Sequence, residues 1–102
     1  MDKDEASVEA LQDAIQHLHG CGSRWVESVE VHERLGDVTV WRGSVQVFDL
    51  VDHPQAKRAY AWSVATEGGR RKFTAVLELP PVKDARSAVQ ASIVAAERKK
   101  RS

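Results

Sequence analysis

The chain has one cysteine, three prolines and no long apolar run among its 102 residues. The single Cys21 cannot form an internal disulfide, so nothing indicates an oxidising compartment. No stretch approaches the roughly 20 apolar residues of a membrane span. The acidic start of the chain lacks the basic and apolar regions of a signal peptide. We therefore expect a soluble, cytoplasmic protein without a membrane partner.

Metal-ligating residues are few. His17, His19 and Cys21 carry three possible ligand atoms at a spacing of two residues. Side chains two positions apart point about 200° apart on a helix, so the two histidines do not converge there. No second group of Cys and His completes a tetrahedral site, and a lone cysteine is typically a small buried hydrophobe. We expect no metal and no cofactor.

The chain also lacks a glycine-rich phosphate loop, a nucleophile elbow and a HExxH helix. Asp49, Asp52 and His53 bring carboxylates near an imidazole, and these are the groups of general acid–base catalysis. They also precede Pro54, in a segment where aspartate and proline are expected for the turn alone. We therefore expect a protein that is not an enzyme.

Hydrophobic periodicity predicts a helix, four strands and a second helix. Val8, Leu11, Ile15 and Leu18 form one stripe of the first helix, which glycines end. Asp84 is a suitable N-cap for the second helix. β-Branched and aromatic residues alternate with polar ones, between turn residues, over 24–31, 38–50, 56–66 and 72–79.

Composition and length indicate one folded domain. The chain has 42% hydrophobic and 29% charged residues, which is typical of a globular protein. We expect a single domain over residues 1–102, with residues 98–102 as a frayed basic tail. The order of elements predicts an α+β fold, α-β-β-β-β-α. Its four-stranded, mainly antiparallel sheet is expected to carry both helices on one face.

The apolar pattern of the second strand changes near Gly43. Apolar residues occupy odd positions at Trp41, Val45 and Val47, but an even position at Phe48. A glycine inside a strand often marks a bulge, and a bulge shifts the side-chain pattern by one residue. We therefore predict a bulge at Gly43.

Both faces of the third strand are apolar. Alternation places Tyr60 and Trp62 on one face, whereas the other carries Ala59, Ala61, Ser63 and Ala65. If both helices cover one face, the small-residue face needs another cover, and a second copy of the chain is the simplest. These four residues are a predicted dimer interface, although a row of alanines also lets a helix approach closely. The unpaired edges of the sheet offer a second route of association.

Opposite charges are segregated along the chain. Residues 1–52 hold eleven acidic and four basic residues, and residues 53–102 hold four acidic and eleven basic residues. Such asymmetry is typical of a surface for an anionic partner, although two halves can also neutralise each other after folding. Basic side chains at loops and helix ends can follow a phosphate backbone. The candidate nucleic-acid contacts are Lys57, Arg58, Arg70, Arg71, Lys72, Lys83, Arg86, Arg98, Lys99, Lys100 and Arg101.

Two resemblances bear on the fold. The order of elements is loosely similar to that of double-stranded RNA-binding domains, which run α-β-β-β-α, but this chain has a fourth strand and an acidic first helix. The segments Val47–Leu50, His53–Pro54, Lys57–Trp62 and Leu77–Pro81 resemble a family of small uncharacterised bacterial proteins of unknown function. The second resemblance implies a self-standing bacterial domain and implies no substrate.

The expected function is therefore that of a small binding module. Its action would be protein–protein interaction or self-assembly through the sheet, with a homodimer or an unknown protein as partner. The alternative is binding of RNA or DNA through the basic clusters of the C-terminal half.

Overall fold

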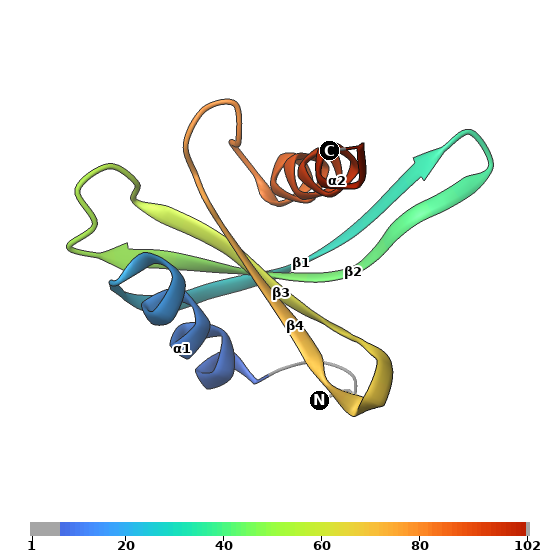
Figure 1. Ribbon diagram of the computed structural model, residues 1–102. Coiled ribbons are helices and arrows are strands. Elements are labelled where there is room, and N and C mark those ends of the chain that lie inside the picture. Colours follow the sequence, from blue (N-terminus) through green and yellow to red (C-terminus); the bar gives the residue numbers. More distant parts are fainter. Residues whose placement is uncertain (1–6, 102) are drawn as a thin grey trace.

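A computed structural model describes residues 7–101, with the backbone alone at residues 97 and 99–101. The elements are α1 (Val8–His19), β1 (Gly22–Leu35), β2 (Val38–Val51), β3 (Arg58–Ala65), a short 3-10 turn (Glu67–Gly69), β4 (Arg71–Leu77) and α2 (Ala85–Arg101). The strands form one sheet in the order β1-β2-β3-β4, and every pairing is antiparallel. This arrangement confirms the predicted α-β-β-β-β-α fold (Figure 1).

The ends of α1 are set by local hydrogen bonds. The Ser7 side chain accepts a hydrogen bond from the Ala10 N–H at 3.1 Å, which satisfies one of the unpaired donors of the first turn. Gly20 ends the helix in the left-handed conformation with φ 69°, and its N–H donates to the Gln16 carbonyl at 2.8 Å. The predicted glycine stop is confirmed.

α2 begins at a reciprocal cap. The Ser87 N–H donates to the Asp84 carboxylate at 2.8 Å, and the Asp84 N–H donates to Ser87 Oγ at 3.0 Å. This pairing satisfies two backbone donors at once, and it confirms Asp84 as the N-cap. The helix continues through Arg101, so residues 98–101 are helical, and fraying of the tail over residues 98–102 stays a prediction. Residue 102 lies outside the described residues.

The sheet consists of two long hairpins that share a short seam. β1 and β2 pair from Gly22 with Val51 to Leu35 with Val38. β2 and β3 pair at four positions, from Gln46 with Ala61 to Asp49 with Arg58. The far halves of the β1–β2 and β3–β4 hairpins therefore extend beyond the seam, and they point in different directions (Figure 1).

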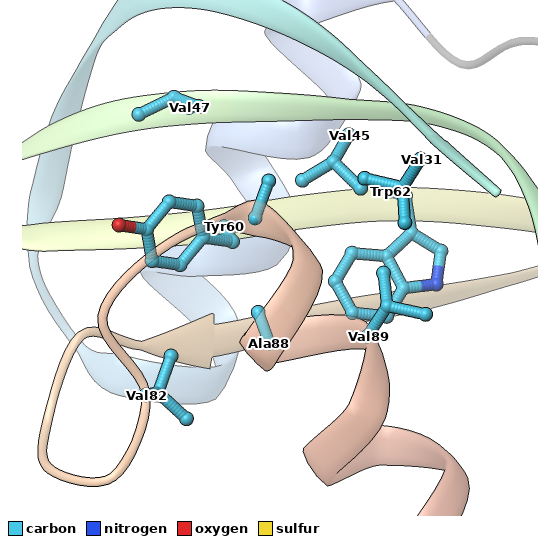
Figure 2. Close-up of a cluster of buried hydrophobic side chains, with 9 residues drawn as sticks. Val31, Val45, Val47, Tyr60, Trp62, Val82, Ala88 and Val89 are labelled. Atoms are coloured by element: carbon cyan, nitrogen blue, oxygen red, sulfur yellow. The ribbon is translucent and has the colours of Figure 1, made fainter. Parts of the chain in front are cut away.

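The two helices cover opposite faces of the sheet, so the expectation that both lie on one face is wrong. Ala59 and Ala61 of β3 pack in a cluster with Leu11 and Ile15 of α1. The alternate residues of β3 pack in a second cluster with α2, formed by Tyr60, Trp62, Val45, Ala88 and Val89 among others. Figure 2 shows this second cluster in front of the sheet and the faint α1 ribbon behind it. Both faces of β3 are apolar because each has its own helix.

The same arrangement explains the pattern of β2 without a bulge at Gly43. Gly43 pairs regularly with Val31, and the register shifts instead lie between Trp25 and Glu27 and between Glu33 and Arg34. Val47 belongs to the α2 cluster and Phe48 to the α1 cluster. Apolar residues therefore appear at odd and even positions because successive side chains enter two different cores.

Candidate functional site

The predicted interface on the small-residue face of β3 is largely closed by the chain itself. Ala59 and Ala61 have no exposed surface, because α1 lies over them at the close distance that alanine permits. Ser63 is half-buried and accepts a hydrogen bond from Arg71 Nε at 3.0 Å. Only Ala65, at the end of the strand, is exposed. The interface prediction is therefore corrected at Ala59 and Ala61: this face is a core.

With both faces covered, the edges of the sheet become the candidate surface. Two hydrogen bonds lie at the two ends of the β3–β4 ladder, from the Thr66 N–H to the Arg70 carbonyl and from the Glu78 N–H to the Arg58 carbonyl. They show which residues of β4 are hydrogen-bonded to β3. Every second residue of β4 then bonds to β3, because hydrogen-bonded pairs alternate in an antiparallel ladder. The backbone N–H and C=O groups that point outward belong to Arg71, Phe73, Ala75 and Leu77.

Part of this outer edge is already occupied. His19 Nε2 lies 2.9 Å from the Ala75 carbonyl oxygen, so α1 caps the edge at that residue. The Leu79 N–H donates to the Leu77 carbonyl at 2.9 Å. Within residues 7–101, the outward backbone groups of Arg71 and Phe73 have no hydrogen-bond partner. The open part of the edge is therefore a short stretch centred on these two residues.

Apolar troughs lie on both sides of this open edge. On the α1 side, a trough of about 440 Å³ is lined by Phe73 and Leu18 together with Ala10, Asp13, Ala14 and His17 of α1. On the α2 side, a trough of about 500 Å³ runs between β4 and the small residues Ala91 and Ala95. Leu18 is 52% exposed and Phe73 is 37% exposed. The sequence placed Leu18 on the apolar stripe of the first helix and indicated the sheet edges only in general, so it did not locate this surface.

The opposite edge, β1, is less suited to strand pairing. A register shift at Val26 interrupts its ladder, and a bulge of this kind twists an edge away from a partner. Its exposed positions include the charged residues Arg24, Glu27, Glu30 and Arg34, beside the exposed Trp25 and Leu35. Charge on an edge strand opposes pairing with another sheet. The β4 edge is therefore the better candidate for association.

The predicted nucleic-acid contacts fall into three separate groups and one residue, Lys57, that lies outside them. Arg70, Arg71 and Lys72 lie at the β3–β4 turn. Arg98 is exposed near the end of α2, where Lys99, Lys100 and Arg101 follow with undescribed side chains. Lys57 is exposed just before β3. The structure brings together a third group around one cleft, formed by Arg58, Lys83 and Arg86.

This cleft, of about 490 Å³, opens beside the start of α2. Its cations are held by acidic residues: Arg58 Nε lies 3.2 Å from Asp49 Oδ1, and Arg86 Nε lies 2.6 Å from Glu33 Oε1. The hydrogen bond to Asp49 is the main cause that raises the pKa of Arg58. The segregation of charge along the sequence is thus partly cancelled in space.

Tyr60 forms the polar end of the α2 core. Its side chain is buried, and its hydroxyl donates a hydrogen bond to the Glu78 carboxylate and lies 3.2 Å from the Lys83 carbonyl oxygen. Burial and then the bond to Glu78 raise the pKa of Tyr60 well above its ordinary value of 10.0. With Trp62 also buried, neither aromatic side chain of this strand is available for stacking on a base.

Of the three residues considered for catalysis, His53 and Asp49 have structural partners, and Asp52 is exposed in the turn. His53 Nδ1 accepts hydrogen bonds from the N–H groups of Gln55 and Ala56, at 3.1 and 2.9 Å, and so closes the turn before β3. Asp49 pairs with Arg58. Cys21 is buried in the α1 cluster. Across residues 7–101, no three His, Cys, Asp or Glu side chains are grouped as a metal site.

Two further findings concern the whole described chain. Neither helix in residues 7–101 is long and apolar enough to cross a membrane. Comparison with protein-family models, with curated proteins and with solved structures finds no match to this chain.

Proposed function

We propose that this chain is a non-enzymatic protein-interaction module whose association surface is the outer edge of β4. The observation that carries the proposal is the position of the free backbone groups of Arg71 and Phe73 between two apolar troughs. An unpaired strand offers regularly spaced donors and acceptors to a second strand, and the troughs beside it add apolar burial.

The partner that we propose is a second copy of the chain. Phe73 carries an outward donor and an outward acceptor, so two antiparallel β4 edges with Phe73 opposite Phe73 bond reciprocally. The two Phe73 side chains then share one face, beside the exposed Leu18 of each copy. Arg71 and Lys72 of the two copies lie on opposite sides of the two-fold axis, which keeps like charges apart. We place this association in the cytoplasm, since Cys21 has no disulfide partner.

Nucleic-acid binding has less support and is left as a prediction. The candidate cations are spread over three separate groups and the single Lys57, and Arg58 and Arg86 are already ion-paired. A titration with RNA and DNA at low salt tests it, because phosphate binding weakens steeply as salt rises.

Sedimentation equilibrium over micromolar to millimolar protein tests the association. We expect the mass of a dimer for the unaltered chain. Phe73→Glu and Leu18→Glu are each expected to weaken the dimer at least about tenfold, because a charge at a pairing edge must be desolvated. Leu35→Glu is the matched control, since Leu35 is 75% exposed at the tip of the other hairpin.

Two results would contradict the proposal. One is a monomer at every concentration. The other is an equal loss of association in Leu35→Glu and Phe73→Glu, which would place the contact at the β1–β2 tip or make it nonspecific. Circular dichroism of each variant shows that it remains folded.

A further inference from the structure

We infer that His19 is a specificity-determining residue of the β4 edge, because it blocks one end of the strand pairing. This inference rests on the proposed association through β4. His19 Nε2 lies 2.9 Å from the Ala75 carbonyl oxygen. A carbonyl oxygen only accepts hydrogen bonds, so the imidazole N–H is the donor. The ring therefore lies on the outer side of β4, where a partner strand would have to bond.

The two-fold pairing at Phe73 places Arg71 of one copy opposite Ala75 of the other. These two residues form the next hydrogen-bonded pair on each side of the axis, since such pairs recur at every second residue. The Arg71 N–H of one copy would donate to the Ala75 carbonyl of the other, which His19 already occupies. The Ala75 N–H has no hydrogen-bond partner within residues 7–101, so it can still donate across the interface. Each end of the ladder thus lacks one of its two bonds.

The position of His19 is fixed by the helix that carries it. The buried apolar stripe of α1 anchors the helix on the sheet, and Gln12 Nε2 donates to the Ser23 carbonyl oxygen at 2.8 Å. Gly20 ends the helix directly after His19. Because the helix is anchored, the imidazole can leave Ala75 only by rotation of its own side chain, which breaks its hydrogen bond. A partner strand must therefore either lack a ladder bond or displace this one.

A second symmetric register avoids Ala75, but Lys72 opposes it. With the two-fold axis at Lys72, Arg71 of each copy lies opposite Phe73 of the other, and the ladder uses open backbone groups. The two Lys72 side chains then face each other in a non-hydrogen-bonded pair, where side chains are closest. Like charges directly opposite each other destabilise a sheet. Lys72 is exposed and has no ion pair among the described residues, so its charge is not neutralised there.

His19 and Lys72 together determine how the edge can pair. Lys72 disfavours the register centred on itself, and His19 shortens the ladder of the register centred on Phe73. An edge strand that is open along its whole length is a template for continued pairing, and proteins protect such edges with side chains or helices. The open stretch at Arg71 and Phe73 therefore supports a short ladder between two copies.

Sedimentation equilibrium of the full chain measures the dimer constant of three histidine variants. His19→Ala frees the Ala75 carbonyl and should tighten the dimer at least about fivefold, because one net hydrogen bond is gained at each end. His19→Gln keeps an N–H donor of similar reach and should stay within about twofold of the unaltered chain. His32→Ala is the matched control, since the exposed His32 bonds to Thr39 on the other hairpin. A site so far from β4 should change the dimer constant less than about twofold.

Hydrogen exchange of backbone amides, followed by NMR, identifies the ladder bonds directly. In the unaltered dimer, the amides of Phe73 and Ala75 should exchange more slowly than at low protein concentration, and the amide of Arg71 should not. In His19→Ala, the Arg71 amide should be slowed as well, because its acceptor is free. Damage to α1 alone would not slow this amide. The measurement therefore separates an unblocked ladder from a loosened helix.

The proposed function and this inference fail in different ways. An unaltered chain that stays monomeric contradicts the proposed dimer. A dimer constant for His19→Ala no tighter than that of the unaltered chain, or no tighter than that of His19→Gln, overturns the blocking role. A monomeric unaltered chain with a dimeric His19→Ala supports the block and contradicts the proposed function alone.

The register gives one further decisive result. Slowed amides at Arg71 and Phe73, with a fast amide at Ala75 in the unaltered dimer, would show pairing centred on Lys72. That pattern would overturn the inference while leaving β4 as the edge that associates.

Discussion

The Trp41 indole meets the Trp62 indole edge to face, with ring centroids 5.6 Å apart and ring planes at 71°. Aromatic pairs favour this geometry. Gly43 makes room for it, since a Cβ at that position would lie only 3.2 Å from Trp41 Cη2. The glycine thus positions a ring that links β2 to β3.

Gly43→Val should lower the free energy of unfolding by about 1–3 kcal/mol, although valine normally favours strands. The added methyl groups must displace Trp41 from Trp62. Gly43→Ala should cost less, because the reduced freedom of the unfolded chain offsets part of the crowding. Urea unfolding measures the stability, and near-ultraviolet circular dichroism reports the tryptophan pair. An unchanged spectrum in Gly43→Val would show that the ring does not need the space.

Ala61→Leu should cost about 1–3 kcal/mol of stability, because the larger side chain has no room under α1. Ala65→Leu is the matched control on the same face of β3. Ala65 is exposed, so its replacement should stay within about 0.5 kcal/mol. Equal effects in urea unfolding would contradict the finding that α1 closes this face.

Asp84→Ala should lower stability by about 1 kcal/mol at neutral pH, since it removes the N-cap of α2. The Asp84 carboxylate accepts hydrogen bonds from Ser87, and these hold the pKa of Asp84 below its ordinary value. The bond from the Ser87 backbone has the larger effect, and the bond from its side chain comes next. A lowered pKa in the folded state means that this contribution is present above about pH 4 and lost as pH falls further. Asp84→Asn keeps the acceptor, so it should retain most of the stability and lose that part of the acid sensitivity.

Tyr60 should make the fold sensitive to alkali. Its pKa is raised in the folded state, so its contribution is present below about pH 10 and is lost as pH rises above that value. Tyr60 is the single tyrosine of the chain, so absorbance at 295 nm follows it alone. We expect no ionisation near pH 10 in the folded protein and normal ionisation in denaturant. Ionisation near pH 10 without unfolding would contradict the buried bond to Glu78.

Tyr60→Phe separates the two parts of that effect. Loss of the hydrogen bond from the Tyr60 hydroxyl to Glu78 should lower the free energy of unfolding by about 1 kcal/mol at neutral pH. The slope of stability against pH above pH 10 should become flatter, because the titrating group is gone.

The order and type of the elements could be predicted because they depend on local patterns. The caps at Gly20 and Asp84 involve bonds within four residues, which a sequence displays directly. The apolar character of both faces of β3 was also visible. Periodicity tells which residues share a face, but it does not tell which helix covers that face, because this depends on the path of each connection. The prediction therefore sought a second chain where α1 already lies.

The candidate sites depend on contacts that are distant in sequence. His19 caps the carbonyl of Ala75 across 56 positions, and Arg86 reaches Glu33 across 53. The basic clusters were visible, but their convergence was not. Arg58 and Lys83 share a cleft only because the segment after β4 returns over the sheet before α2 begins. No local pattern in the chain encodes that return.

The β1–β2 and β3–β4 hairpins are joined by four residue pairs between β2 and β3, so this short ladder can act as a hinge. Each helix contacts both hairpins, since α1 packs on β1 and β4 and α2 packs on β1, β2 and β4. The helices therefore restrict the angle between the hairpins from opposite faces of the sheet. Removing either helix should let that angle vary while the hydrogen-bond ladder of each hairpin stays intact.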